Sequence, residues 1–394
     1  MKSFAKPTNG SKKTTMKLYY TLLLTLIGFF SFGQSFMITN VTVFDGEKVH
    51  ENTSVLVKDG KIIGVSVHLE SDAEVIDGSG KFLMPGMTNS HVHAWAATSL
   101  SEAVKAGVVN LLDMHGVEGF QPAMRALKDS TGFARFYYAG FAATAPEGHG
   151  TQYGFPVPTL ASVDDAGGFV SDRLKAGAHY IKIIEEPWKP TLSHEIVKAV
   201  IDAAHDQNTI AVVHISKVDD AYKVLSNNAN GLVHIWWDEE MPESQLTELT
   251  KNKEFFVIPT LLTSQRALKS IRQRAPDTPF LSDEGLMSEV KRLYEAGVPI
   301  LAGTDPPNVG INYGTDLYEE MKLLSRSGIP NTEVLKSATS YPATFFRLDG
   351  LGYIKPGYAA DLVLLEKSPL DNMDNLNSVE MIWKDGKEVV LNDE

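Results

Sequence analysis

Short runs of alternating hydrophobic and polar residues occur at both ends of the chain. Residues 36–76 include "MITNVTVF" and "SVLVKDGKIIGV", separated by Asp-Gly turns. Residues 352–390 show the same pattern, and "KDGK" at 384–387 repeats the "KDGK" at 58–61. Alternation of this kind, bounded by Asp-Gly pairs, is typical of β-hairpins. We predict that the two regions pair into one small β-sheet domain.

The middle of the chain alternates buried-strand runs with helical stretches. Helical patterns include residues 193–207, which Ser193 can cap, and residues 282–297. The strand runs are the one ending at His91, then 108–113, 135–141, 179–184, 209–214, 231–236, 255–261 and 298–305. Eight such units predict an α/β fold, a (β/α)8 or TIM barrel. We place the barrel at 85–345 and the composite β-sheet domain at 36–84 and 346–394.

The first 34 residues have the pattern of an export signal. Lys12, Lys13 and Lys17 precede the apolar run "LYYTLLLTLIGFFSF", and small and polar residues follow it. The run is shorter than the roughly 20 apolar residues of a membrane-spanning helix, although an uncleaved anchor is the alternative. We predict a signal peptide, with Met16 as an alternative start, and a periplasmic or secreted mature protein without stable membrane insertion.

Charge and cysteine content restrict the partners and the kind of metal site. The formal net charge is −13, and residues 1–35 contribute five lysines and no acid, which leaves −18 for the remainder. A body this acidic repels nucleic acid, so we expect a small-molecule substrate and no nucleic acid partner. The chain has no cysteine, so a metal would need His, carboxylate or modified Lys ligands.

His91 and His93 stand one residue apart at the end of an apolar run, "FLMPGMTNSHVH". Side chains at i and i+2 of a strand share a face, so the two imidazoles project together. Paired imidazoles suit a divalent metal ion. The alternative is a polar pair where a strand meets solvent.

Further metal-capable residues lie towards the ends of other predicted strands. They are Lys182 in the fourth, His214 in the fifth, His234 in the sixth and Asp305 in the eighth. Barrel enzymes place their active sites at the carboxyl ends of the strands. A buried histidine or a turn aspartate explains each residue alone, but their coincidence favours a metal site.

Lys182 lies within "YIKII", where burial of a cation is costly. Pairing with an acid, or extension to the barrel mouth, would resolve that cost. The functional alternative is carboxylation by CO2, because a neutral buried amine is the reactive form. The resulting carbamate could bridge two divalent ions.

These residues resemble the motifs of the amidohydrolase superfamily. The resemblance covers residues 36–394 and includes "GKFLMPGMTNSHVH", "AGAHYIKI", "AVVH", "GLVHI", "AGTD" and "GYIKPGYAADLVLL". Within the superfamily the chain is most similar to the imidazolonepropionase-related group, which includes Xaa-Arg, Xaa-Lys and Xaa-Pro dipeptidases and ochratoxinase-like amidases.

The resemblance implies a binuclear metal centre. By it, His91, His93 and Asp305 hold one ion, His214 and His234 hold the other, and the carbamate of Lys182 bridges both. Zn, Mn and Co suit such ligands alike, and we expect Zn. The reaction implied is hydrolysis of an amide or peptide C–N bond by a metal-bridged hydroxide, with Asp305 as the catalytic base and then acid.

The substrate loops depart from that group. His115 replaces a usual glycine, and "IIEEPWKP" replaces a small glycine-rich loop. The segment "GHG" either turns His149 towards the substrate or is simply a flexible Gly-rich turn. We therefore take His115, His149, Tyr153 and Arg266 as candidate substrate contacts, with Lys189 as a further cation.

Three alternatives remain open at this stage, besides the possibility of a homo-oligomer. One is a mononuclear deaminase of the same superfamily, but "HISKVDD" lacks the glutamate that those enzymes use. Another is a cyclic amide or lactone hydrolase. The third is a non-catalytic metal-binding barrel, which the presence of all six candidate ligands disfavours.

Overall fold

The computed structural model describes residues 35–252 and 254–391. Among these residues, no helix combines the length and the apolar content needed to cross a membrane. The predicted export signal at 1–34 lies outside the described residues.

Parallel strands form the barrel in the described part of the chain. They are β6 (Met87–Val92), β7 (Val108–Asp113), β8 (Arg135–Tyr138), β9 (Ile181–Ile184), β10 (Ala211–His214), β11 (Gly231–Val233) and β12 (Phe256–Ile258). The last segment, 298–305, pairs with β12 through Ile300 and Val257. It also reaches β6, because the Ser90 N–H donates to the Ala302 carbonyl at 2.9 Å.

The remaining junction joins β8 to β9. Ala143, just beyond β8, pairs with Ile183 of β9. The ring of eight parallel segments predicted from the hydrophobic pattern is thereby confirmed.

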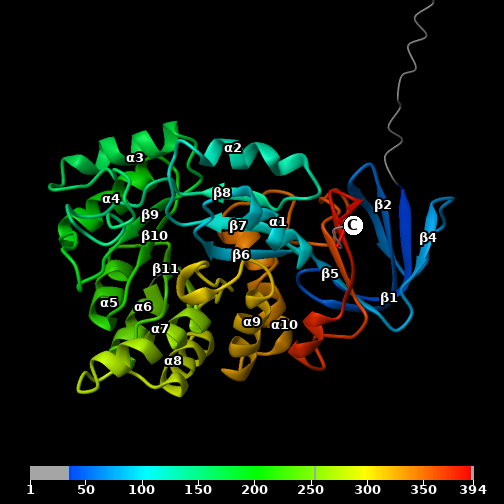
Figure 1. The fold of residues 1–394 in the computed structure, drawn as a ribbon. Coiled ribbons are helices and arrows are strands. Elements are labelled where there is room, and N and C mark those ends of the chain that lie inside the picture. The colour runs from blue at the N-terminus through cyan, green and yellow to red at the C-terminus, as the bar shows by residue number, and fades with distance from the viewer. Residues whose placement is uncertain (1–34, 253, 392–394) are drawn as a thin grey trace, which may run out of the picture. The chain divides into compact units, whose positions relative to one another are not determined.

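Helices pack around the barrel strands (Figure 1). They are α1 (Ala97–Lys105), α2 (Gln121–Arg125), α3 (Asp165–Lys175), α4 (His194–Asp206), α5 (Val218–Ser226), α6 (Glu243–Asn252), α7 (Leu261–Arg274), α8 (Asp283–Glu295), α9 (Asp316–Arg326), α10 (Asn331–Ser337) and α11 (Ser340–Phe345), with 3-10 turns at Ala126–Asp129, Asn308–Gly310 and Met373–Asn377. The two helices expected from sequence begin at their predicted caps. Ser193 accepts a hydrogen bond from the Ile196 N–H, and Ser282 accepts one from the Gly285 N–H.

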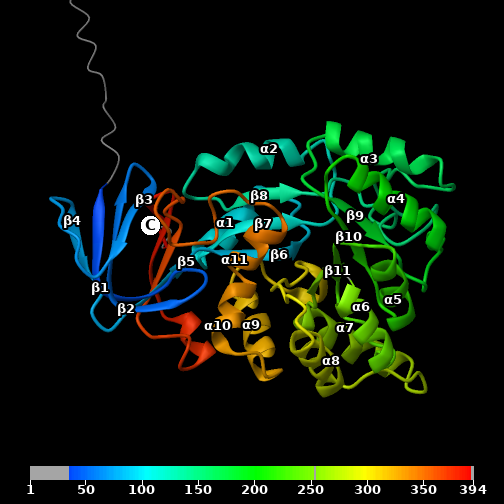
Figure 2. The same ribbon diagram turned by 180° about the vertical axis from the view of Figure 1, so that it is seen from behind.

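The two ends of the chain form one sheet beside the barrel, and the views from both sides show them together (Figures 1 and 2). Its strands are β1 (Phe36–Phe44), β2 (Val49–Lys58), β3 (Lys61–Ser66), β4 (Glu74–Asp77), β5 (Phe82–Pro85), β13 (Leu362–Leu365), β14 (Val379–Lys384) and β15 (Lys387–Glu388). The strand order is β15-β14-β13-β5-β1-β2-β3, with β4 on β1. The N- and C-terminal segments therefore meet where β5 pairs with β13, as predicted.

The two "KDGK" segments form the turns of two hairpins in this sheet. Asp59 and Gly60 have φ of 52° and 77°, and Asp385 and Gly386 have φ of 49° and 68°. Positive φ at both central residues is the type I′ geometry that Asp-Gly favours. The turns also touch each other, since a Cβ on Gly386 would lie 2.9 Å from the Gly60 Cα.

A buried ion-pair cluster connects the sheet to the barrel. Arg135 of β8 forms a two-pronged contact with Asp361, at 2.6 and 3.1 Å, and reaches Asp385 at 2.5 Å. Burial alone would lower the pKa of Arg135, but the charge of Asp361 raises it. Removing one partner would leave a buried charge unpaired, so the cluster fixes the β8 end of the barrel against the sheet.

Candidate metal centre

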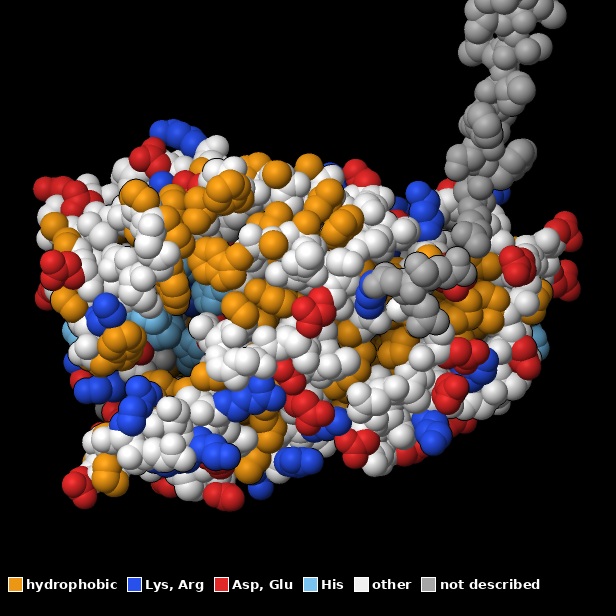
Figure 3. Space-filling view, in the orientation of Figure 1, with side chains coloured by type: hydrophobic (Ala, Val, Ile, Leu, Met, Phe, Trp, Pro, Cys, Tyr) orange, Lys and Arg blue, Asp and Glu red, His pale blue; other side chains and the backbone are white. Residues whose placement is uncertain are grey.

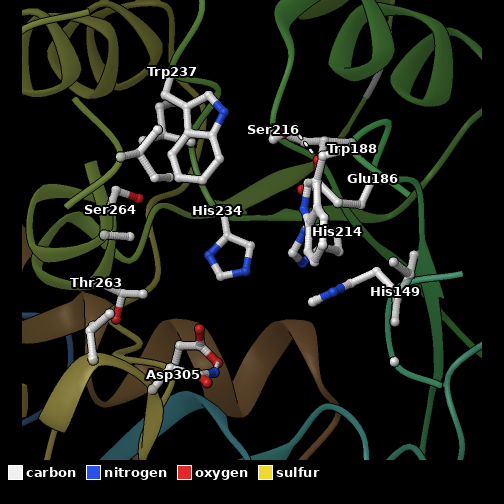
Figure 4. Close-up of a pocket in the computed structure, with 18 of the residues that line it drawn as sticks. His149, Glu186, Trp188, His214, Ser216, His234, Trp237, Thr263, Ser264 and Asp305 are labelled. Atoms are coloured by element: carbon white, nitrogen blue, oxygen red, sulfur yellow. Dashed lines mark hydrogen bonds and ion pairs between the residues drawn. The ribbon is translucent and has the colours of Figure 1, made fainter. Parts of the chain in front are cut away.

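A cavity of about 700 Å³ opens at the carboxyl ends of the barrel strands. On the surface it is a hollow in which histidine side chains are visible between hydrophobic ones (Figure 3). The polar residues that line it include Lys182, His214, His234 and Asp305. In the close-up, His149, His214 and His234 point into the same space, and Asp305 faces them from the opposite side (Figure 4).

The first group of candidate ligands consists of His91, His93 and Asp305. The Nε2 atoms of the two histidines lie 3.3 Å apart. Asp305 Oδ1 is 3.2 Å from His91 Nε2 and 3.1 Å from His93 Nε2. Ligand atoms at about 2.0–2.2 Å from one ion are themselves separated by roughly 3–3.5 Å, so this donor set fits a divalent cation.

His234 and His214 continue the cluster. Ligand atoms of His91, His234 and Asp305 lie within 4.8 Å of one another. The ring centroids of His214 and His234 are 4.5 Å apart. The structure thus brings both predicted histidine groups to one place, next to each other.

Hydrogen bonds fix which ring nitrogen is available in His93, His214 and His234. His93 Nδ1 donates to the His115 carbonyl at 3.1 Å, and His214 Nε2 is 2.9 Å from the Glu186 carboxylate. His234 Nδ1 is 2.6 Å from Thr260 Oγ1. The other nitrogen of each ring is left for an ion. Histidines that bind a metal through one nitrogen usually make a hydrogen bond of this kind through the other.

Left-handed backbone conformations mark the same strand ends. His234, Thr260 and Asp305 have φ of 72°, 47° and 59°. A non-glycine residue in this region costs about 1–3 kcal/mol and is held there only by its surroundings. The strain aims His234 and Asp305 into the cavity instead of along their strands.

Lys182 is 2% exposed and lies among these side chains. Within the described residues, its ammonium group has no hydrogen bond or ion pair. Burial lowers the pKa of Lys182 to about 7, although the charges of Asp305 and Asp113 oppose this shift. The alternative of a lysine paired with an acid is therefore not what the structure shows.

The amidohydrolase family model matches residues 82–389 of the chain. The chain belongs to the amidohydrolase family. It is therefore a hydrolase that acts on carbon–nitrogen bonds, on a TIM barrel with an additional β-sheet domain.

Relatives of this amidohydrolase include enzymes of different specificity. The chain is 24% identical to a 5'-deoxyadenosine deaminase of Methanothermobacter thermautotrophicus, over 84% of each sequence. It is 22% identical to the ochratoxinase of Aspergillus niger, over 77% of this chain and 75% of that protein. Among solved structures, a Xaa-Pro dipeptidase with bound methionine superimposes with a TM-score of 0.77 at 21% identity, covering 90% of this chain and 99% of the other.

Three histidines of the amidohydrolase cluster are in the neutral form that binds metal. Burial lowers the pKa values of His91, His214 and His234 well below the ordinary value for histidine. Neutral imidazole is the ligand form, so little proton release would accompany binding at these three residues.

Only some of the residues predicted to contact the substrate have side chains free to do so in the cavity. His149 and Tyr153 line the cavity. His115 also lines it, but both of its ring nitrogens are engaged: Nδ1 accepts from the Ala142 N–H and Nε2 donates to the Gly150 carbonyl. His115 therefore holds the loop that carries His149.

The structure corrects the prediction that Arg266 contacts the substrate, because Arg266 does not line the cavity. Its guanidinium lies 3.4 Å from Asp316 of α9. Lys189 does not line the cavity either; it stacks on Trp188, with its Nζ 5.5 Å from the ring centroid. Besides Lys182, the basic side chains that line the cavity in the described part of the chain are Arg274, at the end of the same helix as Arg266, and Lys217.

Glu186 was also missed by the sequence reasoning. It is 3% exposed, contacts His214 and accepts a hydrogen bond from Ser216 Oγ at 2.8 Å. The sequence could have indicated Glu186, because it lies four residues after Lys182 and strand alternation puts both side chains on the same side.

Proposed function

We propose that this amidohydrolase binds two divalent ions, Zn²⁺ by preference, and hydrolyses the amide bond of a dipeptide or an N-acyl amino acid outside the cytoplasm. The observation that supports it is the convergence of histidine nitrogens, a carboxylate and an unpaired buried lysine at one cavity. Export rests on the pattern of residues 1–34.

Each candidate ligand has a place in this proposal. His91, His93 and Asp305 would hold one ion, His214 and His234 would hold the other, and Lys182, as a carbamate, would supply oxygen ligands to both. When bound, two such ions lower the pKa of a water molecule and polarise the substrate carbonyl. Glu186 orients His214, and the His115 carbonyl orients His93.

Asp305 is the residue that moves the proton. Burial alone would raise the pKa of Asp305, but the hydrogen bond and charge of His93 lower it, so the carboxylate is ionised. Its described contacts, to the two histidines and to Asn308, involve Oδ1. Oδ2 is then the atom that accepts the proton of the attacking water and donates it to the leaving nitrogen.

The cavity wall favours a substrate with an apolar group and an anionic end. Trp188, Trp237 and Phe280 provide aromatic surface, while Arg274 and Lys217 bring positive charge to the rim. Aromatic walls bind apolar side chains, and a guanidinium binds a carboxylate with two hydrogen bonds. Dipeptides and N-acyl amino acids with an apolar side chain combine these features.

Replacing Arg274 by glutamine should raise KM for an N-acyl amino acid by about 3–10-fold and leave kcat within about twofold. The effect is modest because an exposed cation is screened by water. Steady-state kinetics on one substrate and on its uncharged C-terminal amide would measure it, and the amide should show no change.

Arg266→Gln is the matched control for Arg274. It removes the same group from the same helix, but its guanidinium faces Asp316 and not the cavity. Equal effects of the two substitutions, or an equal effect on the uncharged amide, would contradict a carboxylate contact at Arg274.

The two-ion proposal predicts that the catalytic centre retains about two divalent ions per chain through gel filtration after expression with zinc and bicarbonate, with any ion held elsewhere adding to that count. Elemental analysis of the purified protein measures this ratio. His234→Ala should lower it, whereas the exposed His205→Ala should not. A ratio near one that persists in excess metal would count against a bridged pair.

A further inference from the structure

Three side chains outside the cavity form a second cluster of metal-capable groups. Glu185 follows β9, His194 is the first residue of α4, and Asp220 lies in the first turn of α5. Their ligand atoms lie within 4.8 Å of one another. Strand alternation separates this cluster from the catalytic one, since Glu185 points away from the side to which Lys182 and Glu186 project.

Glu185 is the buried member of the cluster. It is 2% exposed, and its Oε1 lies 2.7 Å from His194 Nδ1. Its Oε2 is buried and has no hydrogen-bond partner among the described residues. A buried carboxylate oxygen without a donor costs free energy, so a partner is expected there.

The protein charges around the cluster do not supply that partner. Burial raises the pKa of Glu185 to about 8, and the charge of Asp220 adds to the shift. Burial also raises the pKa of Asp220. The nearest cation on α5, Lys223, is paired with Asp219 at 2.5 Å and is partly exposed.

We propose that Glu185, His194 and Asp220 bind a divalent cation of the Zn²⁺ type at a site separate from the catalytic cavity. One imidazole and two carboxylates are a donor set that such ions accept. Glu185 is fixed, while His194 and Asp220 are partly exposed, so their side chains can close on an ion.

An ion at this site would secure one wall of the cavity. It connects the end of β9 with α4 and α5, which lie next to each other in the fold (Figures 1 and 2). Glu185 directly precedes Glu186, which contacts His214, and the loop that follows carries Trp188 into the cavity lining. The role is structural, and it does not depend on the substrate proposed above.

Equilibrium dialysis of the metal-loaded enzyme against Zn²⁺ tests the site. Wild type should bind about one ion per chain more than Glu185→Gln or His194→Ala. Glu195→Gln is the matched control, because it removes a carboxylate from the same helix turn at an exposed position. Added Zn²⁺ should also raise Tm by about 2–4 °C in wild type and Glu195→Gln, but not in the other two.

Equal binding by all four proteins would overturn the proposal. If Glu185→Gln does not fold, His194→Ala decides the question, because His194 is partly exposed. Incomplete loading of the catalytic centre would lower all four counts alike, since none of these side chains lines the cavity. A difference confined to Glu185→Gln and His194→Ala therefore reports this site alone.

Discussion

Asp305→Asn is expected to lower kcat by about 10²–10⁴-fold, the usual contribution of a positioned general base. The amide retains an oxygen that can accept the Asn308 hydrogen bond, but it cannot take up a proton. Asparagine also tolerates the φ of 59° at this position, so the backbone should keep its conformation. Rates on an N-acyl amino acid and metal content should be measured on the same preparation.

Asp316→Asn provides the control for Asp305→Asn. Asp316 is another buried carboxylate near the barrel mouth, but it pairs with Arg266 and does not line the cavity. Its substitution should change kcat little. A near wild-type rate for Asp305→Asn with its metal retained would show that Asp305 is a ligand or turn residue without a role in proton transfer.

The barrel was predictable because the hydrophobic pattern within each strand is enough to identify that strand. Runs such as 108–113 and 209–214 are apolar on both faces, as buried parallel strands must be. The sheet was predictable from its type I′ turns, whose Asp-Gly pairs are local. The contact between these turns, and the Arg135 cluster that joins sheet and barrel, depend on residues more than 200 positions apart and have no local signal.

The site was predictable at the strand ends and less so in the loops. Alternation places His91 with His93, and the same rule would have found Glu186. It also separates Glu185 from Glu186, which puts adjacent glutamates in two different clusters. Arg266 and Arg274 share α7, and only the packing of that helix against α9 decides which of them faces the cavity.

Lys182→Ala should cost more activity than any other single change proposed for this enzyme. It removes the proposed bridge, so both metal content and turnover should fall. The loss should exceed the roughly 10–100-fold typical for residues that only orient a ligand. Metal analysis and kinetics at fixed metal concentration would measure both effects.

Acetate or propionate, added with excess metal, should restore part of the activity of Lys182→Ala. The alanine leaves space in a buried position that is 2% exposed in the parent protein, and a short carboxylate can present the two oxygens of the lost carbamate there. Lys182→Met is the matched control: it removes the same nitrogen but fills the space, so the added acid should not help. A lysine that served only as a buried cation gives no reason for rescue, because an anion would then replace a positive charge. If Lys182→Ala keeps its metal and its activity without added acid, the carbamate is wrong, and the two-ion mechanism fails with it.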